Sequence, residues 1–147
     1  MIVYRDATRA DVPAIVALLA DDMLGSARET VSLDQYLQAF DRMAQEGGNH
    51  VIVAEDAGEI VASYQITFIS GLSLSAARRA LIESVRVASA HRNRGLGDGL
   101  MRDAEARARQ EGCSLIQFTT NKARTDAHRF YDRLGFTPSH IGYKKQL

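Results

Sequence analysis

The stretch Ala80-Leu-Ile-Glu-Ser-Val-Arg-Val-Ala-Ser-Ala-His-Arg-Asn-Arg-Gly-Leu-Gly-Asp-Gly-Leu100 reads as a strand, a short polar turn and the start of a helix. In a strand, successive side chains point to opposite faces. The alternation therefore predicts a strand over residues 81–87. One face would carry Leu81, Glu83, Val85 and Val87, and the other Ile82, Ser84 and Arg86.

The turn that follows is rich in glycine. Gly95, Gly97 and Gly99 would allow the backbone a close approach to a neighbouring group, and an amphipathic pattern typical of a helix begins in the same place. The first N–H groups of a helix have no partner within it, and the helix dipole adds positive character there. The sequence therefore predicts a cradle for an anion.

Two familiar phosphate cradles do not match this turn. A P-loop needs lysine and then serine or threonine after its last glycine, but Gly97 is followed by Asp98. A dinucleotide fingerprint that starts at Gly95 needs glycine at its sixth place, where this chain has Leu100.

Two motifs do match one known family. The run Arg92-Asn93-Arg94-Gly95-Leu96-Gly97 resembles the Gln/Arg-x-x-Gly-x-Gly/Ala motif with which the GCN5-related N-acetyltransferases (GNAT family) bind the pyrophosphate of acetyl-CoA. Thirty residues on, the segment 127–136 resembles that family's Ala-x-x-Phe-Tyr-x-x-x-Gly-Phe signature. The two motifs have the right order and separation, and the resemblance extends over roughly residues 50–145.

The resemblance implies where the cosubstrate acetyl-CoA would bind. Backbone groups of Val85 and Val87 would hold the pantetheine arm, with Arg86 between them. The amides from Arg92 through Asp98 would hold the pyrophosphate, a segment that includes Asn93, Arg94, Gly95, Leu96 and Gly97. Arg92 and Arg94 would add positive charge beside the phosphates. The alternative for Arg94 is a solvated arginine on a turn.

Acetylation of an amine requires two proton transfers. A free alkylamine has a pKa of roughly 10, so a base must remove its proton near pH 7. Glu83, acting through water, is the candidate base, and the alternative is a structural carboxylate paired with Arg78 or Arg79. By resemblance, the Tyr131 hydroxyl would meet the departing thiolate, and the alternative is an aromatic ring that only packs in the core.

One position departs from the family pattern. Seven residues before the tyrosine the family often has an asparagine that contacts the cofactor, and this chain has Arg124. Arg124 would then reach a phosphate of the cofactor instead. Asn121, which follows the preceding strand, is the candidate to line the same gap.

The remaining elements fit the order of the acetyltransferase fold. We expect a single domain over residues 1–147, of mixed α and β class, with a sheet of about six or seven strands and about four helices. The sheet would be antiparallel in its first half and parallel at its centre. The expected strands are 2–7, 50–55, 59–69, 81–87, 115–120 and 136–144, and the expected helices are 8–20, 32–47, 95–110 and 126–134. Thr8, and Ser32 together with Gln35, are predicted to cap the first two helices, and Gly112 to close the third.

Composition excludes several other classes of function. Lys plus Arg equals Asp plus Glu at 18 each, so no overall field favours nucleic acid or an anionic membrane. The N-terminus resembles no secretory signal and the longest apolar run, 14–20, is too short to span a bilayer, so a cytoplasmic location is expected. Four scattered histidines indicate no metal site, and the lone Cys113 is interpreted as a small buried side chain.

These observations predict an N-acetyltransferase that works by direct transfer in a ternary complex, with a small amine or an amino-acid derivative as acceptor. The alternative is a regulatory module that binds acyl-CoA without catalysis. A regulator that binds DNA through arginines 102, 107 and 109 is a weaker alternative, because the net charge is zero. A homodimer formed through the C-terminal edge strand is possible.

Overall fold

A computed structural model describes residues 1–21, 29 and 31–147. The chain divides into two compact units, Met1–Gln117 and Phe118–Leu147, and each is described by itself. The single domain expected over the whole length stays a prediction.

The first unit is built on a mixed sheet. Within the described residues this sheet has five strands in the order β1-β2-β3-β4-β5. The first four are antiparallel to their neighbours, and β5 runs parallel to β4, as the sequence predicted. Their bounds are β1 Ile2–Asp6, β2 Asn49–Asp56, β3 Glu59–Ser70, β4 Arg78–Val87 and β5 Leu115–Gln117.

The expected strand count of six or seven is wrong for the part of the chain described. Residues 136–144 have no strand structure, although the sequence predicted the last strand there. Pro138 removes a backbone donor from this segment, and almost all of its side chains are exposed, so no buried face rewards strand pairing. The strand expected over 115–120 is also shorter and ends at Gln117.

Helices flank this sheet. Among the described residues of the first unit they are η1 Arg9–Asp11, α1 Val12–Ala20, α3 Leu33–Gln45, α4 Ser73–Ala76, η2 Ser89–His91 and α5 Leu96–Gln110. The predicted cap of α3 is confirmed. The Gln35 N–H donates to the Ser32 hydroxyl, and the Ser32 N–H donates to the side-chain carbonyl of Gln35. At the C-terminal end of α5, Gly112 has φ +75° and closes a Schellman motif in which the Cys113 N–H bonds the Ala108 carbonyl.

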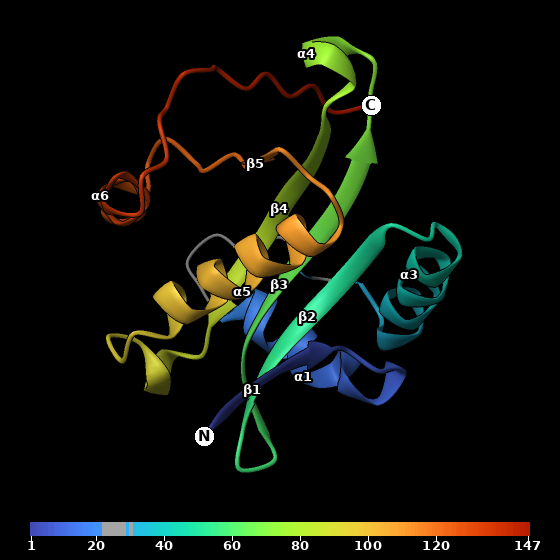
Figure 1. The fold of residues 1–147 in the computed structure, drawn as a ribbon. Coiled ribbons are helices and arrows are strands. Elements are labelled where there is room, and N and C mark those ends of the chain that lie inside the picture. Colours follow the sequence, from blue (N-terminus) through green and yellow to red (C-terminus); the bar gives the residue numbers. More distant parts are fainter. Residues whose placement is uncertain (22–28, 30) are drawn as a thin grey trace. The chain divides into compact units, whose positions relative to one another are not determined.

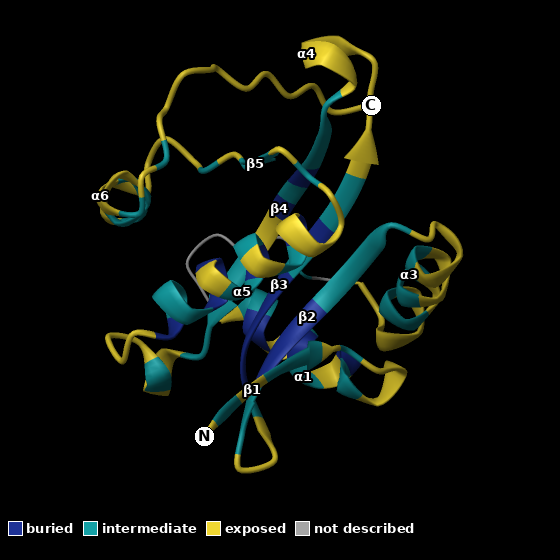
Figure 2. Ribbon diagram, in the orientation of Figure 1, coloured by how far each residue is buried: buried dark blue, intermediate teal, exposed yellow. Residues whose placement is uncertain are grey.

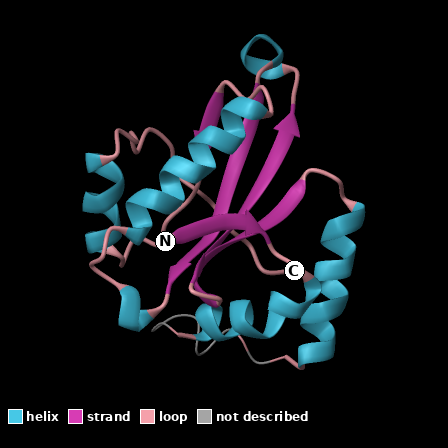
Figure 3. Ribbon diagram, turned by 60° about the horizontal axis from the view of Figure 1, so that its bottom comes forward, coloured by secondary structure: helices cyan, strands magenta, loops and turns pink. Residues whose placement is uncertain are grey.

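The two faces of the sheet have different covers. Figure 1 shows α5 lying across one face, with α1 behind the sheet on the other. The hydroxyl of the buried Tyr64 donates to Asp103 of α5 at 2.6 Å, which assigns the face of Tyr64, Ile66 and Ile82 to α5. Figure 2 shows that burial is concentrated in the middle of β2 and β3, between these layers. Figure 3 displays the strands of the sheet with the helices around them.

The connection from β2 to β3 is a tight hairpin. Asp56 pairs with Glu59, so only Ala57 and Gly58 form the loop, one residue fewer than the sequence predicted. Their φ angles are +50° and +85°. Two central residues with positive φ are what a type I′ turn requires, and this turn matches the natural twist of the two strands.

An ion network fixes β1 to the start of the first helix. Arg5 donates to Asp11 at 2.7 Å and to Glu55 of β2 at 2.6 Å. The Asp11 carboxylate also accepts from the Thr8 N–H at 2.7 Å, in the cap predicted from the sequence. The hydrogen bond from Arg5 lowers the pKa of Asp11 to about 2, below its ordinary value of 3.8.

A bulge interrupts β4 beside β3. Glu83 pairs with Gln65 and Arg86 with Ser63, so two residues of β4 stand opposite Tyr64 alone. One of them, Ser84, has φ +54°. An extra residue in one strand of an antiparallel pair is a β-bulge.

The bulge reverses the expected side-chain alternation. Val87 pairs with Ala62, which lies on the same face of β3 as the partner of Ile82, so Val87 faces the same way as Ile82. Glu83 instead shares its face with Arg86. The prediction that Glu83, Val85 and Val87 line one face is therefore wrong, because alternation holds only while the strand pairing is regular.

Candidate functional site

The turn predicted to form an anion cradle contains two residues of left-handed conformation. Asn93 and Gly95 have φ of +64° and +76°, whereas the φ of Arg94 between them is not positive. Such alternation can turn successive N–H groups toward one side, as in backbone nests that bind anions, and we call residues 93–95 the nest. The nest leads directly into α5, whose first hydrogen bond to the preceding turn runs from the Gly99 N–H to the Gly95 carbonyl at 3.2 Å. The N–H groups of residues 96–98 precede that bond in the chain and belong to the first turn of the helix, where N–H groups have no partner within the helix.

The glycines of this turn have separate roles. Gly95 is the N-cap of α5 and adopts a left-handed conformation that other residues enter at a cost. Gly99 serves the packing of the first unit instead, because a Cβ placed there would overlap the hydroxyl of Tyr4 in β1. The close approach expected at Gly99 is therefore that of the Tyr4 side chain.

Arg92 is occupied with holding the turn. Its guanidinium donates to the Val87 carbonyl at 3.3 Å and to the Asp21 carbonyl, at the end of α1, at 2.9 Å. The Asp21 carboxylate in turn accepts from the Ser89 N–H at 3.2 Å. These bonds tie the segment before the cradle to both α1 and β4. Arg94 is exposed, and one nitrogen of its guanidinium lies 2.7 Å from the His91 ring. Because Arg92 already bonds two main-chain carbonyls, Arg94 is the better placed of the two for a phosphate.

The residues predicted for the pantetheine arm lie at the end of β4. The ladder with β5 covers only Arg79–Leu81, and the following part of β4 pairs with β3. Val85, Arg86 and Val87 are half-buried. The Val85 carbonyl accepts from the Arg86 guanidinium at 2.9 Å, and the Val87 carbonyl from Arg92. A ligand that bonds to either carbonyl would share it with an arginine.

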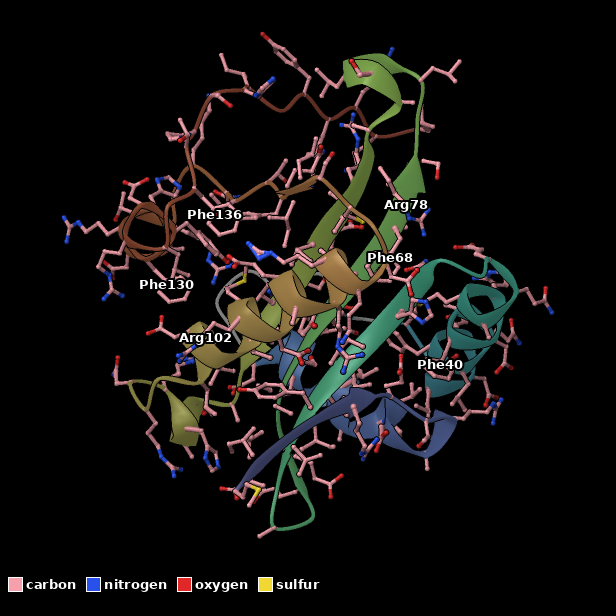
Figure 4. The ribbon with its side chains drawn as sticks, viewed as in Figure 1. Phe40, Phe68, Arg78, Arg102, Phe130 and Phe136 are labelled. Atoms are coloured by element: carbon pink, nitrogen blue, oxygen red, sulfur yellow. The ribbon has the colours of Figure 1, made fainter. Side chains whose placement is uncertain are left out.

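Glu83 is exposed on β4, just before the bulge. Both arginines of the alternative, Arg78 and Arg79, have other partners in the structure. The Arg78 guanidinium bonds the Glu111 carbonyl and lies 5.9 Å from the Phe68 ring centre, and Figure 4 shows these two side chains near each other. The Arg79 guanidinium donates to the side-chain carbonyl oxygen of Gln117 at 2.8 Å.

A chain of polar side chains crosses the sheet on the Glu83 face. Gln65 Nε2 donates to Asn49 Oδ1 at 2.8 Å, and the Thr67 hydroxyl donates to the same oxygen at 3.2 Å. Asn49 Nδ2 donates to Glu46 at 2.9 Å. We call Glu46, Asn49, Gln65 and Thr67 the polar relay. These residues belong to no motif in the sequence, although polar residues at two alternate positions of an apolar strand, 65 and 67, were a signal.

The second unit contains Tyr131 and its neighbours. Helix α6, Thr125–Arg133, is followed by Gly135 with φ +90°, and the Phe136 N–H bonds the Tyr131 carbonyl. The Tyr131 ring lies 4.2 Å from Phe118, 5.2 Å from Phe130 and 6.1 Å from Phe136, measured between ring centres. Figure 4 labels Phe130 and Phe136 of this cluster. The Tyr131 ring therefore packs against other aromatic rings, as the alternative expected. The role of its hydroxyl stays a prediction.

Asn121 and Arg124 form the turn before α6. The Asn121 side-chain carbonyl accepts from the Ala123 N–H at 2.9 Å, and its main-chain carbonyl from the Arg124 N–H at 3.0 Å. This is an Asx turn. Arg124 is the N-cap of α6 and is exposed. Their predicted contacts with a cofactor remain predictions, and Asn121 also has a local structural role.

Residues 1–21, 29 and 31–147 contain neither a metal-binding cluster nor a membrane-spanning helix. No group of three or more histidine, cysteine, aspartate or glutamate side chains in these ranges is arranged to hold a metal ion. No helix there has the length and apolar character needed to cross a membrane. Cys113, expected to be a small buried side chain, is half-buried, and this burial raises the pKa of its thiol.

Comparison with protein families finds one match over most of the chain. The family model described as "Acetyltransferase (GNAT) family" matches residues 13–136. Among curated proteins, aminoalkylphosphonate N-acetyltransferase of Salmonella typhimurium is 41% identical over 66 residues. That alignment covers 45% of this chain and only 43% of the Salmonella enzyme.

Solved structures match over the whole chain. A protein from Bacillus halodurans C-125 described as a transcriptional regulator is 42% identical, with a TM-score of 0.96 and coverage of 100% of both chains. A protein from Clostridium acetobutylicum, solved with acetyl-CoA, is 18% identical and has a TM-score of 0.75, covering 98% of this chain and 96% of that one. At that identity the second likeness shows the fold alone.

Proposed function

Because the chain belongs to the GNAT family of acetyltransferases, we propose that it transfers the acetyl group of acetyl-CoA to the nitrogen of a small primary amine. The reaction is a direct attack of the amine on the thioester in a ternary complex. The C–S bond breaks as the C–N bond forms, the amine loses a proton, and the CoA thiolate gains one.

The observation that carries this proposal is the nest of alternating backbone hands at Asn93, Arg94 and Gly95, continuous with the start of α5. The pyrophosphate of acetyl-CoA is an anion of the kind that such N–H groups bind. The residues we assign to it are Asn93, Arg94, Gly95, Leu96, Gly97 and Asp98, and Arg92 holds the turn in place. Val85, Arg86 and Val87 are assigned to the pantetheine arm.

Two side chains are assigned to the proton transfers. Glu83 is exposed on β4 and takes the proton of the amine, directly or through water. The Tyr131 hydroxyl gives a proton or a hydrogen bond to the sulfur, with its ring fixed by the aromatic cluster of the second unit. Bound acetyl-CoA supplies the activated acetyl group. Fixed positions for the two partners remove much of the entropic barrier to the attack.

A small amine is the acceptor that we favour. The Salmonella relative is named as an acetyltransferase of aminoalkylphosphonates, which are small amines, and it shares 41% identity over the aligned stretch. A compound that carries an amine and an anionic group at its other end is therefore the first acceptor to test.

The test combines thermal unfolding with thiol release. Acetyl-CoA at about 100 times its dissociation constant should add about 2.7 kcal/mol to the free energy of unfolding and raise the midpoint by several degrees. Thiol release is then followed across aminoalkylphosphonates, amino-acid derivatives and amino sugars. Release with one of these classes supports the proposal, whereas absence of any shift with acetyl-CoA overturns it.

A matched pair of variants locates the cosubstrate. Gly97→Glu places a carboxylate in the cradle and should abolish the shift with acetyl-CoA. Gln110→Glu introduces the same charge at the opposite end of α5 and should retain the shift. Equal shifts in both variants would place acetyl-CoA elsewhere.

A regulatory role is the second candidate. The Bacillus protein with 42% identity over the full chain is described as a transcriptional regulator. A domain that binds acyl-CoA without turnover would meet that description. Stabilisation by acetyl-CoA, without thiol release on any amine, would favour this second function over the first.

A further inference from the structure

The polar relay on the Glu83 face has only one consistent orientation. A carboxylate accepts hydrogen bonds and donates none, so Glu46 must face the NH₂ group of Asn49. The Asn49 carbonyl oxygen then points the other way, where it accepts from both Gln65 and Thr67. Its two lone pairs are filled by these two donors. The assignment of N and O in both amides therefore follows from Glu46 at the end of the chain.

The orientation of Asn49 fixes that of Gln65. Since Gln65 must donate its NH₂ group to Asn49, its carbonyl oxygen, Oε1, is the atom turned away from the relay. In the part of the chain that the structure describes, this oxygen has no hydrogen-bond partner, although Gln65 is half-buried. The oxygen is not among the fully buried side-chain atoms, so a ligand or water can reach it.

Gln65 and Glu83 lie together. They are directly paired across β3 and β4, and side chains of such a pair extend from the same face with Cβ atoms about 5 Å apart. One contributes a carbonyl oxygen of fixed orientation and the other a carboxylate, and both accept hydrogen bonds. The ligand that fits two adjacent acceptors is a group with several N–H donors.

We propose that Gln65 Oε1 and Glu83 together bind the N–H groups of the acceptor amine, with the relay through Asn49 to Glu46 holding Gln65 in the accepting orientation. The inference rests on the proposed function, because it gives that reaction its amine subsite. It makes Gln65 a residue that binds the acceptor, and Asn49 and Glu46 positioning residues. A primary amine satisfies this subsite, while an anionic group is repelled.

The first test removes the acceptor oxygen while retaining the shape of the side chain. Gln65→Met should raise the KM for the amine about tenfold, the effect expected for loss of one hydrogen bond to the substrate, and leave the KM for acetyl-CoA unchanged. A Gln65→Met enzyme with an unchanged KM for the amine overturns the inference.

The second test reverses the relay from a distance. Lysine only donates, so Glu46→Lys should draw the Asn49 carbonyl toward residue 46 and turn the NH₂ group of Gln65 toward Glu83. This exposed substitution should then raise the KM for the amine as Gln65→Met does. Glu59→Lys, an equal change of charge at the exposed start of β3, is the control and should leave that KM unchanged. An equal effect of both lysines would indicate a general effect of charge and overturn the relay.

Binding measurements separate this inference from the proposed reaction. Stabilisation by the amine in thermal unfolding is measured for the same variants in the presence of CoA. If the wild type binds an amine without releasing thiol, the reaction is wrong, and the loss of amine binding in Gln65→Met still supports the subsite. If the wild type is stabilised by no amine and acetylates none, both are overturned.

Discussion

The hydroxyl of Tyr4 in β1 lies against the backbone of Gly99 in α5 so closely that a Cβ at position 99 would overlap it. The same helix begins at the anion cradle, and the Arg107 guanidinium bonds the Tyr4 main-chain carbonyl at 3.4 Å further along. Contact with β1 therefore sets the height of α5 above the sheet and with it the position of the cradle.

Gly99→Ala should destabilise the protein. Overlap with a packed ring forces a shift that typically costs about 1–3 kcal/mol, which exceeds the gain of about 1 kcal/mol from replacing glycine in a helix. The free energy of unfolding in urea measures the loss. Tyr4→Phe removes the overlapping oxygen, so the alanine should be tolerated better in that background. Equal losses in both backgrounds would show that the hydroxyl is not the obstacle.

Ser84→Gly should stabilise the bulge of β4. Ser84 has φ +54°, a left-handed conformation that glycine adopts without strain, and the gain should be about 0.5–1 kcal/mol. Ser84→Val, a branched residue in the same conformation, should lose about 1–2 kcal/mol. Urea unfolding of both variants tests the pair. A valine as stable as the wild type would mean that the bulge relaxes into regular pairing.

Asp11 should contribute stability that is lost in acid. Its folded pKa of about 2 lies below the unfolded value of 3.8, so its contribution is complete above about pH 5 and falls as the pH drops toward 2. Allowing for partial exposure of Arg5, the wild type should lose roughly 1 kcal/mol more than Asp11→Asn between pH 6 and pH 3. Urea unfolding at the two pH values gives both numbers. Parallel losses would mean that the Arg5 bond does not lower the pKa.

Tyr131→Phe should separate turnover from binding. The ring keeps its contacts with Phe118 and Phe130, so folding and the KM for acetyl-CoA should change little. The missing hydroxyl should lower kcat by about 10²-fold or more, as loss of a proton donor does. Steady-state kinetics and thermal unfolding check the two parts. A variant as active as the wild type would remove Tyr131 from the mechanism and leave only its packing role.

Local features of the fold could be predicted from the sequence because neighbouring residues decide them. The caps at Thr8 and Ser32, the closing glycine at 112 and the parallel pair after β4 follow from side chains and periodicity within a few positions. The nest at 93–95 is local in the same way, since its two left-handed residues are adjacent to the helix that it begins.

Only the tertiary structure decided how the strands pair with one another. The sequence of β4 alternates without a break, and only its pairing with β3 shows that Ser84 is extra and that Glu83 and Val87 face opposite ways. The same pairing brings Gln65 beside Glu83, whereas Asn49 comes from β2 and Glu46 from the turn before it. Motif and periodicity therefore determined the family and the cradle, whereas register, a property of two strands together, determined which side chains form the proposed amine subsite.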